Sequence, residues 1–419
     1  MDFHFLHAAD IHLDSPLRGL TAYEGAPVEC FRSATRAALR NLIDRAIVGG
    51  AAFVVIAGDL YDGDWPDFGT GLFLVQELER LRKAGIRAVI LFGNHDAHSR
   101  ITHSLPWPDN AYRFDHKRAH SIALDDLGVV LHGQSFERMD VAANLALGYP
   151  PPVAGRLNIG VLHTALEGNA RHATYAPCTL DQLRGHGYDY WALGHVHGFE
   201  ILHREPWVVF PGNLQGRHIR ETGPKGCVSV AVADGRVVGV EPVILDVARW
   251  LLVEVPAAGC ESRERLQARA VAAVRDAVAG RADGRPAAVR LCLQGETPLH
   301  GELSERLDEL ENAFRAELMG VGECWLESVK LQTLPPVLRD AAAEREAAGL
   351  LAHLLSGAAA DPALRASIEV ALRPLREKLP ADLVGEAEDT PLLAALRAGR
   401  LQEIVAAVLP DLLAMGGEG

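Results

Sequence analysis

Residues 53–62 read FVVIAGDLYD, five apolar residues that run directly into a glycine and a polar group. An apolar run of this length that stops at glycine is typical of a buried strand. Similar apolar runs end at Gly93, His163 and Gly194. Polar residues lie at the end of each run or directly after it. Because open α/β sheets bind their ligands outside the carboxyl ends of the strands, these polar residues are expected to share one edge.

Five polar blocks follow one another in this way over residues 1–200. They are Asp10-Ile11-His12, Gly58-Asp59-Leu60-Tyr61-Asp62, Gly93-Asn94-His95-Asp96, His163 and Gly194-His195-Val196-His197. The candidate metal ligands offer oxygen and nitrogen but no thiolate: Asp10, His12, Asp59, Asn94, His163, His195 and His197. Mixed imidazole and carboxylate sets suit Mn, Fe or Zn. This set exceeds one tetrahedral site, so we expect two metal ions that share a carboxylate, an arrangement suited to displacement at phosphorus.

The ordered set DxH, GDxxD, GNHD, H and GHxH resembles the motifs of the metallophosphoesterase (calcineurin-like) superfamily. The flanking sequences DIHLDSPL (residues 10–17) and PGNLQGR (residues 211–217) are similar to SbcD-like DNA-repair exonucleases, notably their YhaO type. One block alone is a weak signal, but five in order are specific. The metal motifs cover scattered points over roughly residues 1–200, and the resemblance fades after about residue 245.

The resemblance implies a role for each motif residue. One metal would be held by Asp10, His12 and His197, the other by Asn94, His163 and His195, with Asp59 bridging. His95 would face the scissile phosphate, stabilising it or protonating the leaving oxygen, and Asp62 would orient His95. The residue chemistry agrees, because an imidazole that acts as an acid needs a partner that fixes its tautomer. An ordinary turn carboxylate explains Asp62 and Asp96 equally well, and Asp96 has no distinct expected role.

The alternation of strand and helix over residues 1–245 predicts a two-sheet α/β sandwich, the metallophosphoesterase domain. Strands are expected at 3–9, 53–57 and 86–92, helices at 28–48 and 72–84, and strand pairs at 199–202 with 207–210 and at 228–232 with 237–240. Asp234-Gly235 between the last two runs is a strong hairpin signal.

Residues 246–335 predict a small α+β domain. Strands are expected at 250–255, 288–293 and 324–331, and helices at 262–279 and 303–318. A comparable module in SbcD-like enzymes caps the catalytic face, and a bystander domain is the alternative. Residues 336–419 are rich in Ala and Leu and predict a helical, partner-binding region.

An apolar stripe in this last region predicts a protein partner. It consists of Leu401, Ile404, Val405, Val408, Leu409, Leu412 and Leu413, which recur at helical spacing. Helix-in-groove docking onto a coiled coil is one interpretation. The resemblance implies an SMC-type coiled-coil ATPase as that partner. Packing of the helices against one another is the alternative, and a homodimer is left open.

The charge of the chain opposes tight binding of DNA by the chain alone. It has 41 Lys and Arg against 55 Asp and Glu, a net charge of −14, whereas duplex-binding domains usually carry a basic face. A partner that supplies DNA-binding surface resolves this conflict. We therefore expect a Mn²⁺-dependent DNA-repair nuclease that acts with the ATPase. A phosphomonoesterase or cyclic-nucleotide phosphodiesterase is the alternative, and complete ligand blocks argue against a non-catalytic scaffold.

The sequence also predicts a cytoplasmic location. Its six cysteines form no C-x-x-C pair, which favours reduced thiols. No apolar run approaches the roughly 20 residues that cross a bilayer. The amino terminus lacks the basic segment of a signal peptide. No membrane partner is expected.

Overall fold

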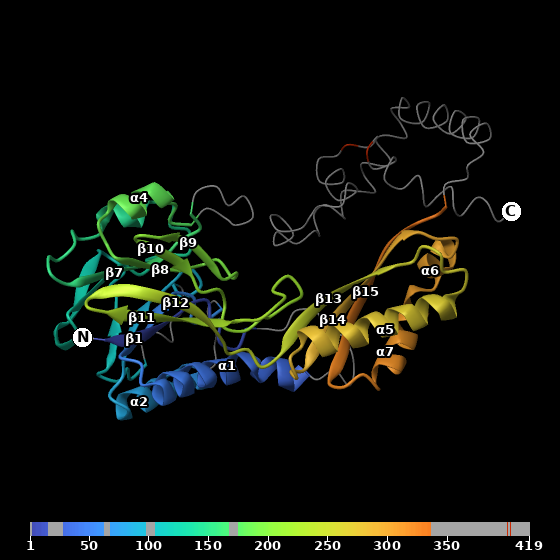
Figure 1. The fold of residues 1–419 in the computed structure, drawn as a ribbon, viewed down its shortest axis with the longest axis horizontal. Coiled ribbons are helices and arrows are strands. Elements are labelled where there is room, and N and C mark those ends of the chain that lie inside the picture. Colours follow the sequence, from blue (N-terminus) through green and yellow to red (C-terminus); the bar gives the residue numbers. More distant parts are fainter. Residues whose placement is uncertain are drawn as a thin grey trace. The chain divides into compact units, whose positions relative to one another are not determined.

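The computed structural model describes residues 2–15, 28–62, 68–97, 105–166, 175–336, 400 and 403. The predicted partner-binding stripe near the carboxyl terminus lies outside the described residues, as does nearly all of the predicted helical region. Two six-stranded sheets and one three-stranded sheet make up the described architecture (Figure 1).

The first sheet has the strand order β12-β11-β1-β2-β3-β4. Its strands are β1 (Phe3–Ala8), β2 (Phe53–Ala57), β3 (Arg87–Leu91), β4 (Ala111–Arg113), β11 (Gly226–Ala233) and β12 (Arg236–Ile244). Strands β1 to β4 are parallel, and β11 pairs with β1 antiparallel. Helices α1 (Val28–Gly49) and α2 (Phe68–Lys83) connect the parallel strands, as expected for right-handed crossovers.

The second sheet has the order β5-β6-β7-β8-β10-β9. Its strands are β5 (His120–Leu124), β6 (Val129–Gly133), β7 (Leu157–His163), β8 (Tyr190–Gly194), β9 (Glu200–Arg204) and β10 (Trp207–Phe210), with α4 (Leu180–Gly185) between β7 and β8. Strands β6, β7, β8 and β10 are parallel, and the antiparallel β5 and β9 form the edges.

Side chains of the fully buried strand β2 alternate between two cores. Phe53 and Val55 belong to the cluster that also contains Ile159 and Tyr190 of the second sheet. Val54 and Ile56 belong to a second cluster, on the opposite face of the sheet. Successive residues of a strand point to opposite faces, so one continuous apolar run fills both cores.

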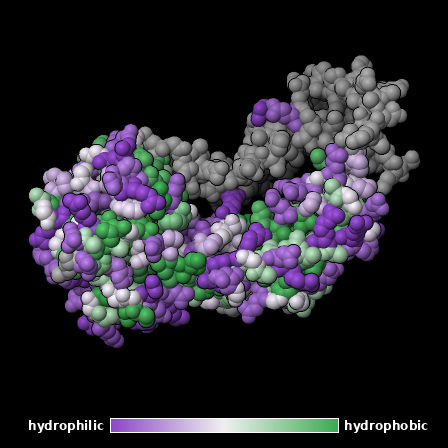
Figure 2. Space-filling model, viewed as in Figure 1, coloured by the Kyte–Doolittle hydropathy of each residue, from purple (hydrophilic) through white to green (hydrophobic). Residues whose placement is uncertain are grey.

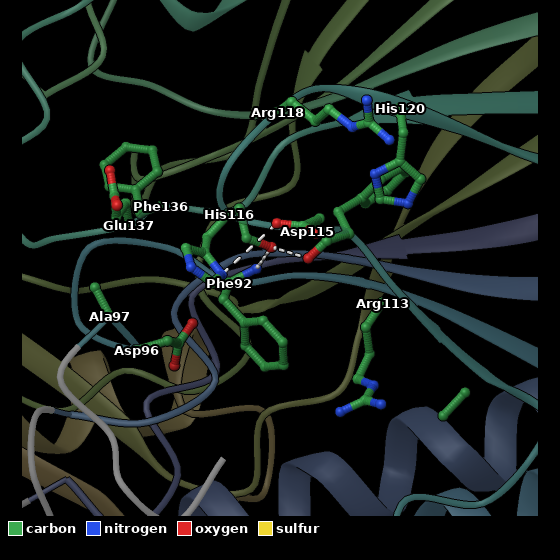
Figure 3. A pocket seen from close by; sticks show the side chains of 13 residues that line it. Phe92, Asp96, Ala97, Arg113, Asp115, His116, Arg118, His120, Phe136 and Glu137 are labelled. Carbon is green, nitrogen blue, oxygen red and sulfur yellow. Dashed lines mark hydrogen bonds and ion pairs between the residues drawn. The ribbon is translucent and has the colours of Figure 1, made fainter. Parts of the chain in front are cut away.

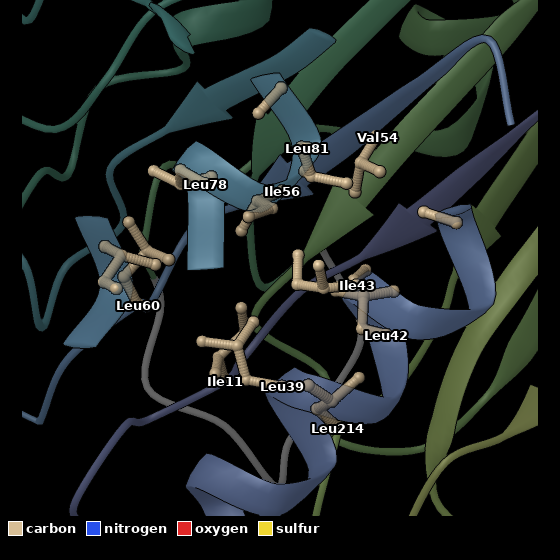
Figure 4. Packing of buried hydrophobic residues seen from close by; sticks show 14 of the residues in the cluster. Ile11, Leu39, Leu42, Ile43, Val54, Ile56, Leu60, Leu78, Leu81 and Leu214 are labelled. Carbon is tan, nitrogen blue, oxygen red and sulfur yellow. The ribbon is translucent and has the colours of Figure 1, made fainter. Parts of the chain in front are cut away.

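Helices α1 and α2 cover the core that contains Val54 and Ile56. Leu39 and Leu42 of α1 and Leu78 and Leu81 of α2 pack toward the sheet (Figure 4). Each of these leucines is at most 1% exposed. Burying a leucine side chain stabilises the fold by about 1.5–3 kcal/mol. The predicted two-sheet α/β sandwich is confirmed.

The third sheet, of order β13-β14-β15, follows the sandwich in sequence. Its elements are β13 (Arg249–Pro256), α5 (Arg263–Arg281), β14 (Ala287–Glu296), α6 (His300–Glu305), α7 (Leu307–Leu318) and β15 (Cys324–Leu334). The single helix predicted for residues 303–318 is wrong, because two helices meet there. Arg306 has φ −120° and ψ 33°, outside the helical region, so the first helix ends before it.

The described residues divide into two compact units. The first contains residues up to 251 together with 278–289 and 322–327, and the second contains 252–277, 290–321, 328–336, 400 and 403. Hydrophilic residues are interspersed with smaller hydrophobic areas on the visible face of each unit (Figure 2). Among the described residues, no helix is long and apolar enough to cross a membrane.

Candidate metal centre

The polar blocks of the sequence lie at the carboxyl ends of five parallel strands. Asp10 and His12 follow β1, Asp59 follows β2, Asn94 follows β3, His163 ends β7, and His195 and His197 follow β8. Two groups of side chains bring their ligand atoms within 4.8 Å of one another: Asp10 with His12 and His197, and Asp59 with His163 and His195. His12, Asp62 and His95 form a third such group. Oδ1 of Asn94 lies 2.9 Å from Nε2 of His163. The structure thus gathers all the predicted ligands at one edge of the two-sheet sandwich.

The backbone that carries these ligands adopts unusual conformations. The φ angle is 51° at Asp10, 45° at His12, 53° at Asp59 and 101° at His195. Positive φ is uncommon for residues other than glycine. Such conformations persist where the surrounding structure over-determines them, and they cluster at functional sites.

Two glycines allow the ligand-bearing strands to approach closely. Gly58 has φ +97°, and a Cβ atom there would lie 2.3 Å from Nδ1 of His163. A Cβ atom on Gly194 would lie 1.9 Å from the carbonyl oxygen of Ala57. Since neither space admits a side chain, the glycines of the GDxxD and GHxH motifs are required by the packing of the site.

His163 has both ring nitrogens directed at oxygen atoms. Its Nδ1 lies 3.0 Å from the carbonyl oxygen of Ala57, and its Nε2 lies 2.9 Å from Oδ1 of Asn94 and 3.4 Å from Oδ2 of Asp59. Burial disfavours the imidazolium, but the charge and hydrogen bond of Asp59 outweigh it and raise the pKa of His163 to about 9. A cation could replace the proton on Nε2, while the bond to Ala57 keeps the tautomer fixed.

His12 also fits a metal ligand. Its side chain is 1% exposed, yet among the described residues neither ring nitrogen has a hydrogen-bond partner. The nearest carboxylate oxygens, of Asp59 and Asp62, lie 3.7 Å away. Burial, helped by the positive charge of Arg217, lowers the pKa of His12 to about 3. The imidazole is therefore neutral, which is the form that binds a metal.

His95 differs from the buried histidines in its exposure. Its side chain is 37% exposed, and its Nδ1 lies 2.9 Å from Oδ1 of Asp62. The other oxygen of Asp62 accepts a hydrogen bond of 2.6 Å from Ser15. Burial opposes ionisation of both groups, but the hydrogen bond and the charge of Asp62 raise the pKa of His95. His12 and His95 together hold the pKa of Asp62 well below its usual range. The raised pKa favours the protonated form of His95, which the carboxylate of Asp62 holds in place.

The sequence predicted no distinct role for Asp96, but its contacts explain the GNHD motif. Its carboxylate accepts backbone N–H bonds of 3.1 Å from Leu60, 2.9 Å from Tyr61 and 2.9 Å from Gly93. Burial, with the charge of Asp59 adding to it, raises the pKa of Asp96 to about 7. Asp96 thus ties the loop after β2 to the loop after β3, and both loops carry candidate ligands.

Glu221 is a residue of the site that the sequence did not predict. Its Oε1 lies 2.6 Å from Nδ1 of His197 and 2.9 Å from Nη2 of Arg217. Its Oε2 accepts bonds from the backbone of Arg217 at 2.7 Å and from Asn213 at 3.0 Å. Although burial opposes ionisation, Arg217 and His197 hold the pKa of Glu221 well below its usual range. Its nearness to the PGNLQGR sequence was the available signal.

Comparisons with known proteins agree with this geometry. Residues 3–199 match the family described as calcineurin-like phosphoesterase, and residues 250–334 match the middle domain of metallophosphoesterase YhaO. The chain is 34% identical over 321 residues to the uncharacterized metallophosphoesterase YhaO of Bacillus subtilis (strain 168), covering 74% of this chain and 78% of that protein.

Two more distant relatives are named for DNA repair or nuclease activity. The DNA double-strand break repair protein Mre11 of Methanopyrus kandleri is 25% identical over 49% of this chain and 48% of that protein. A component of the nuclease SbcCD of Staphylococcus saprophyticus is 24% identical over 55% of this chain and 66% of that protein. The chain spans about half the length of the Mre11 relative.

The fold, the ligand-bearing strand ends and these similarities define a calcineurin-like metallophosphoesterase, a class of metal-dependent phosphoester hydrolases that use a dimetal centre. Within that class, the chain belongs to the YhaO-like family. The resemblance inferred from the sequence motifs is confirmed.

Proposed function

We propose that this chain is a DNA-repair nuclease that hydrolyses phosphodiester bonds at a two-metal centre, as an exonuclease with additional endonuclease activity on single strands. The observation that carries the proposal is the gathering of two ligand groups beside a partly exposed imidazole, His95, which Asp62 holds. The names of the Mre11 and SbcCD relatives support DNA as the substrate.

In this proposal the first metal would be held by Asp10, His12 and His197, and the second by Asn94, His163 and His195, with Asp59 between them. The mixed oxygen and nitrogen donors suit Mn²⁺. Two such ions, when bound, supply positive charge at the phosphate and lower the pKa of bound water.

The protein's own residues supply the remaining chemistry. The hydrogen bond from Nδ1 of His95 to Asp62 leaves Nε2 free to donate a proton to the leaving oxygen. Arg217 is held by Glu221, and its Nη1 lies 3.8 Å from Oδ2 of Asp62. The guanidinium of Arg217 therefore places a positive charge beside the His95–Asp62 pair. This charge would stabilise the single negative charge of a phosphodiester bound there.

A partner is part of the proposal. The SbcCD relative is, by its name, one component of a larger nuclease. The net charge of −14 disfavours unaided binding of long DNA. We infer that an SMC-type coiled-coil ATPase supplies this binding surface, and that the assembly works in the cytoplasm.

Four substrates assayed under Mn²⁺, Mg²⁺ and excess EDTA test the function. Linear duplex, single-stranded circle and bis-p-nitrophenyl phosphate are diesters, whereas p-nitrophenyl phosphate is a monoester. We expect Mn²⁺-dependent hydrolysis of the diesters and none in EDTA. Preferential hydrolysis of the monoester would favour the phosphomonoesterase alternative, and full activity in EDTA would contradict a metal centre.

Replacing Glu221 with glutamine should weaken metal binding about 10–100-fold, the usual effect of altering a group that orients a metal-binding histidine. The amide keeps the shape of Glu221 but removes the charge that His197 and Arg217 face. Metal titration by calorimetry measures this. Glu241→Gln, on the exposed edge strand β12, is the matched control and should bind metal like the wild type. Equal affinities in all three proteins would contradict this role for Glu221.

Metal uptake should release protons at neutral pH. With a pKa of about 9, His163 is protonated in the metal-free protein, and its Nε2 must lose that proton to bind an ion. The apparent affinity for Mn²⁺ should therefore rise with pH up to about 9 and level off above it. Calorimetry in buffers of different ionisation enthalpy counts the released protons, and affinity that is independent of pH from about 6.5 to 9 would contradict the assignment of His163.

A further inference from the structure

A cavity of about 660 Å³ opens beside the GNHD loop, at the edges of the two large sheets. Its walls include Phe92, Arg113 at the end of β4, Arg118, His120 at the start of β5, and Phe136 (Figure 3). This volume is in the range of sites that bind small ligands.

The walls of the cavity are held together by hydrogen bonds. Ser135 Oγ accepts a bond of 3.0 Å from the backbone of Phe92 and donates one of 2.8 Å to the carbonyl of Phe114. The backbone of Phe136 donates to the carbonyl of Phe92 at 2.9 Å. The cavity is therefore preformed by three segments that are distant in sequence.

The cavity shares residues and contacts with the candidate metal centre. Asp96, which ties the two ligand-bearing loops together, lines it and directly follows His95. The ring of Phe136 packs edge-on against that of His163, with 5.6 Å between the ring centroids. The cavity therefore lies directly beside the candidate metal centre.

Two arginines, Arg113 and Arg118, line the cavity together with three carboxylates, Asp96, Asp115 and Glu137. Residues 111–120 contain Arg113, Lys117 and Arg118 against one carboxylate, Asp115. Among the described residues, neither Arg113 nor Arg118 has an ion-pair partner, and the guanidinium of Arg113 lies 5.1 Å from the ring of Trp107.

Two further lining residues fit a nucleotide. Nδ1 of His120 is buried and has no hydrogen-bond partner within the part of the chain that the structure describes. The half-buried ring of Phe92 also lines the cavity and packs edge-on against Trp107. An imidazole and an aromatic ring, beside two arginines that have no ion-pair partner among the described residues, offer the donors and the stacking surface that a nucleotide uses.

We propose that this cavity binds one nucleotide of a single-stranded DNA segment, with its flanking phosphates at Arg113 and Arg118 and its base against Phe92. The inference rests on the proposed nuclease function and specifies where the strand runs beyond the metal centre. Proteins that bind single strands combine basic side chains with aromatic stacking surfaces in this way. Asp115 and Glu137 also line the cavity and oppose phosphate, so affinity should be on the order of 10 µM.

Binding is tested in EDTA, where no metal-dependent cleavage can occur. The probe is a fluorescein-labelled oligothymidylate of about 12 nucleotides, followed by anisotropy. Arg113→Glu and Arg118→Glu should each weaken binding about tenfold and lower the salt dependence, since each removes a phosphate contact. Arg236→Glu, at the start of the opposite edge strand β12, makes the same charge change and should bind like the wild type. Thermal unfolding verifies that each variant is folded.

A second probe tests the base. An abasic strand with the same number of phosphates should bind the wild type more weakly than oligothymidylate, by about tenfold for one stacked base. Equal affinity for the two strands, absence of binding, or equal losses in Arg236→Glu and Arg113→Glu would overturn the proposal. Hydrolysis of bis-p-nitrophenyl phosphate under Mn²⁺ is measured in parallel, so a failure of the proposed nuclease function is seen separately from a failure of the cavity.

Discussion

Replacing His95 with alanine should lower kcat for bis-p-nitrophenyl phosphate by about 10²–10⁴, the usual contribution of a positioned general acid. The metal content should stay at the wild-type value. His95 is assigned to the substrate side of the centre, because its Nδ1 is bound to Asp62 and its ring is far more exposed than that of His12.

Elemental analysis, measured together with the kinetics, distinguishes a general acid at His95 from a metal ligand at His95. His12, Asp62 and His95 also lie close enough to hold a cation. If His95 belonged to such a site, His95→Ala would lose metal together with activity, and that result would overturn its assignment as the acid. His95→Asn can keep a hydrogen bond to Asp62 but cannot transfer a proton, so it should be equally inactive. His4→Ala, at the amino end of β1, is the control and should retain both metal and activity.

The sequence was sufficient to predict the strands that carry the candidate ligands, because each strand is marked by an apolar run within a few consecutive residues. The run from Phe53 to Ala57 is apolar throughout, and the structure buries every residue of it. The hairpin predicted through Asp234-Gly235 pairs β11 with β12 as expected. Short edge strands such as β4, with three residues, lack a comparable run and were not predicted.

The supporting residues of the site could not be predicted because their roles depend on distant neighbours. Asp96 bonds to the backbone of Tyr61, 35 positions away, and Glu221 bonds to His197, 24 positions away. Neither contact leaves a periodic or spaced pattern in the sequence. The positive φ of His195 and the close approach of Gly194 to the backbone of β2 likewise leave no pattern in the sequence.

Replacing Asp59 with alanine should remove metal and activity together, with a loss in rate of at least about 10⁴, the upper end of the range for a single positioned acid. Asp59 is 1% exposed and lies between the ligand groups, with its Oδ2 3.4 Å from His163 and 3.7 Å from His12. Its Oδ1 accepts a hydrogen bond of 3.0 Å from the backbone of His95. Alanine would therefore remove the shared ligand and release the loop that carries the acid.

Asp59→Asn distinguishes the charge of this residue from its shape. Asparagine can still accept the bond from the His95 backbone, so the loop should keep its position, but the negative charge that faces both imidazoles is lost. We expect this variant to fold and to bind metal more weakly than the wild type but better than Asp59→Ala. Both variants should also lower the raised pKa of His163, because Asp59 is the main group that raises it. NMR titration of the metal-free proteins measures that shift. An Asp59→Ala protein that retains the full metal content would contradict the bridging assignment.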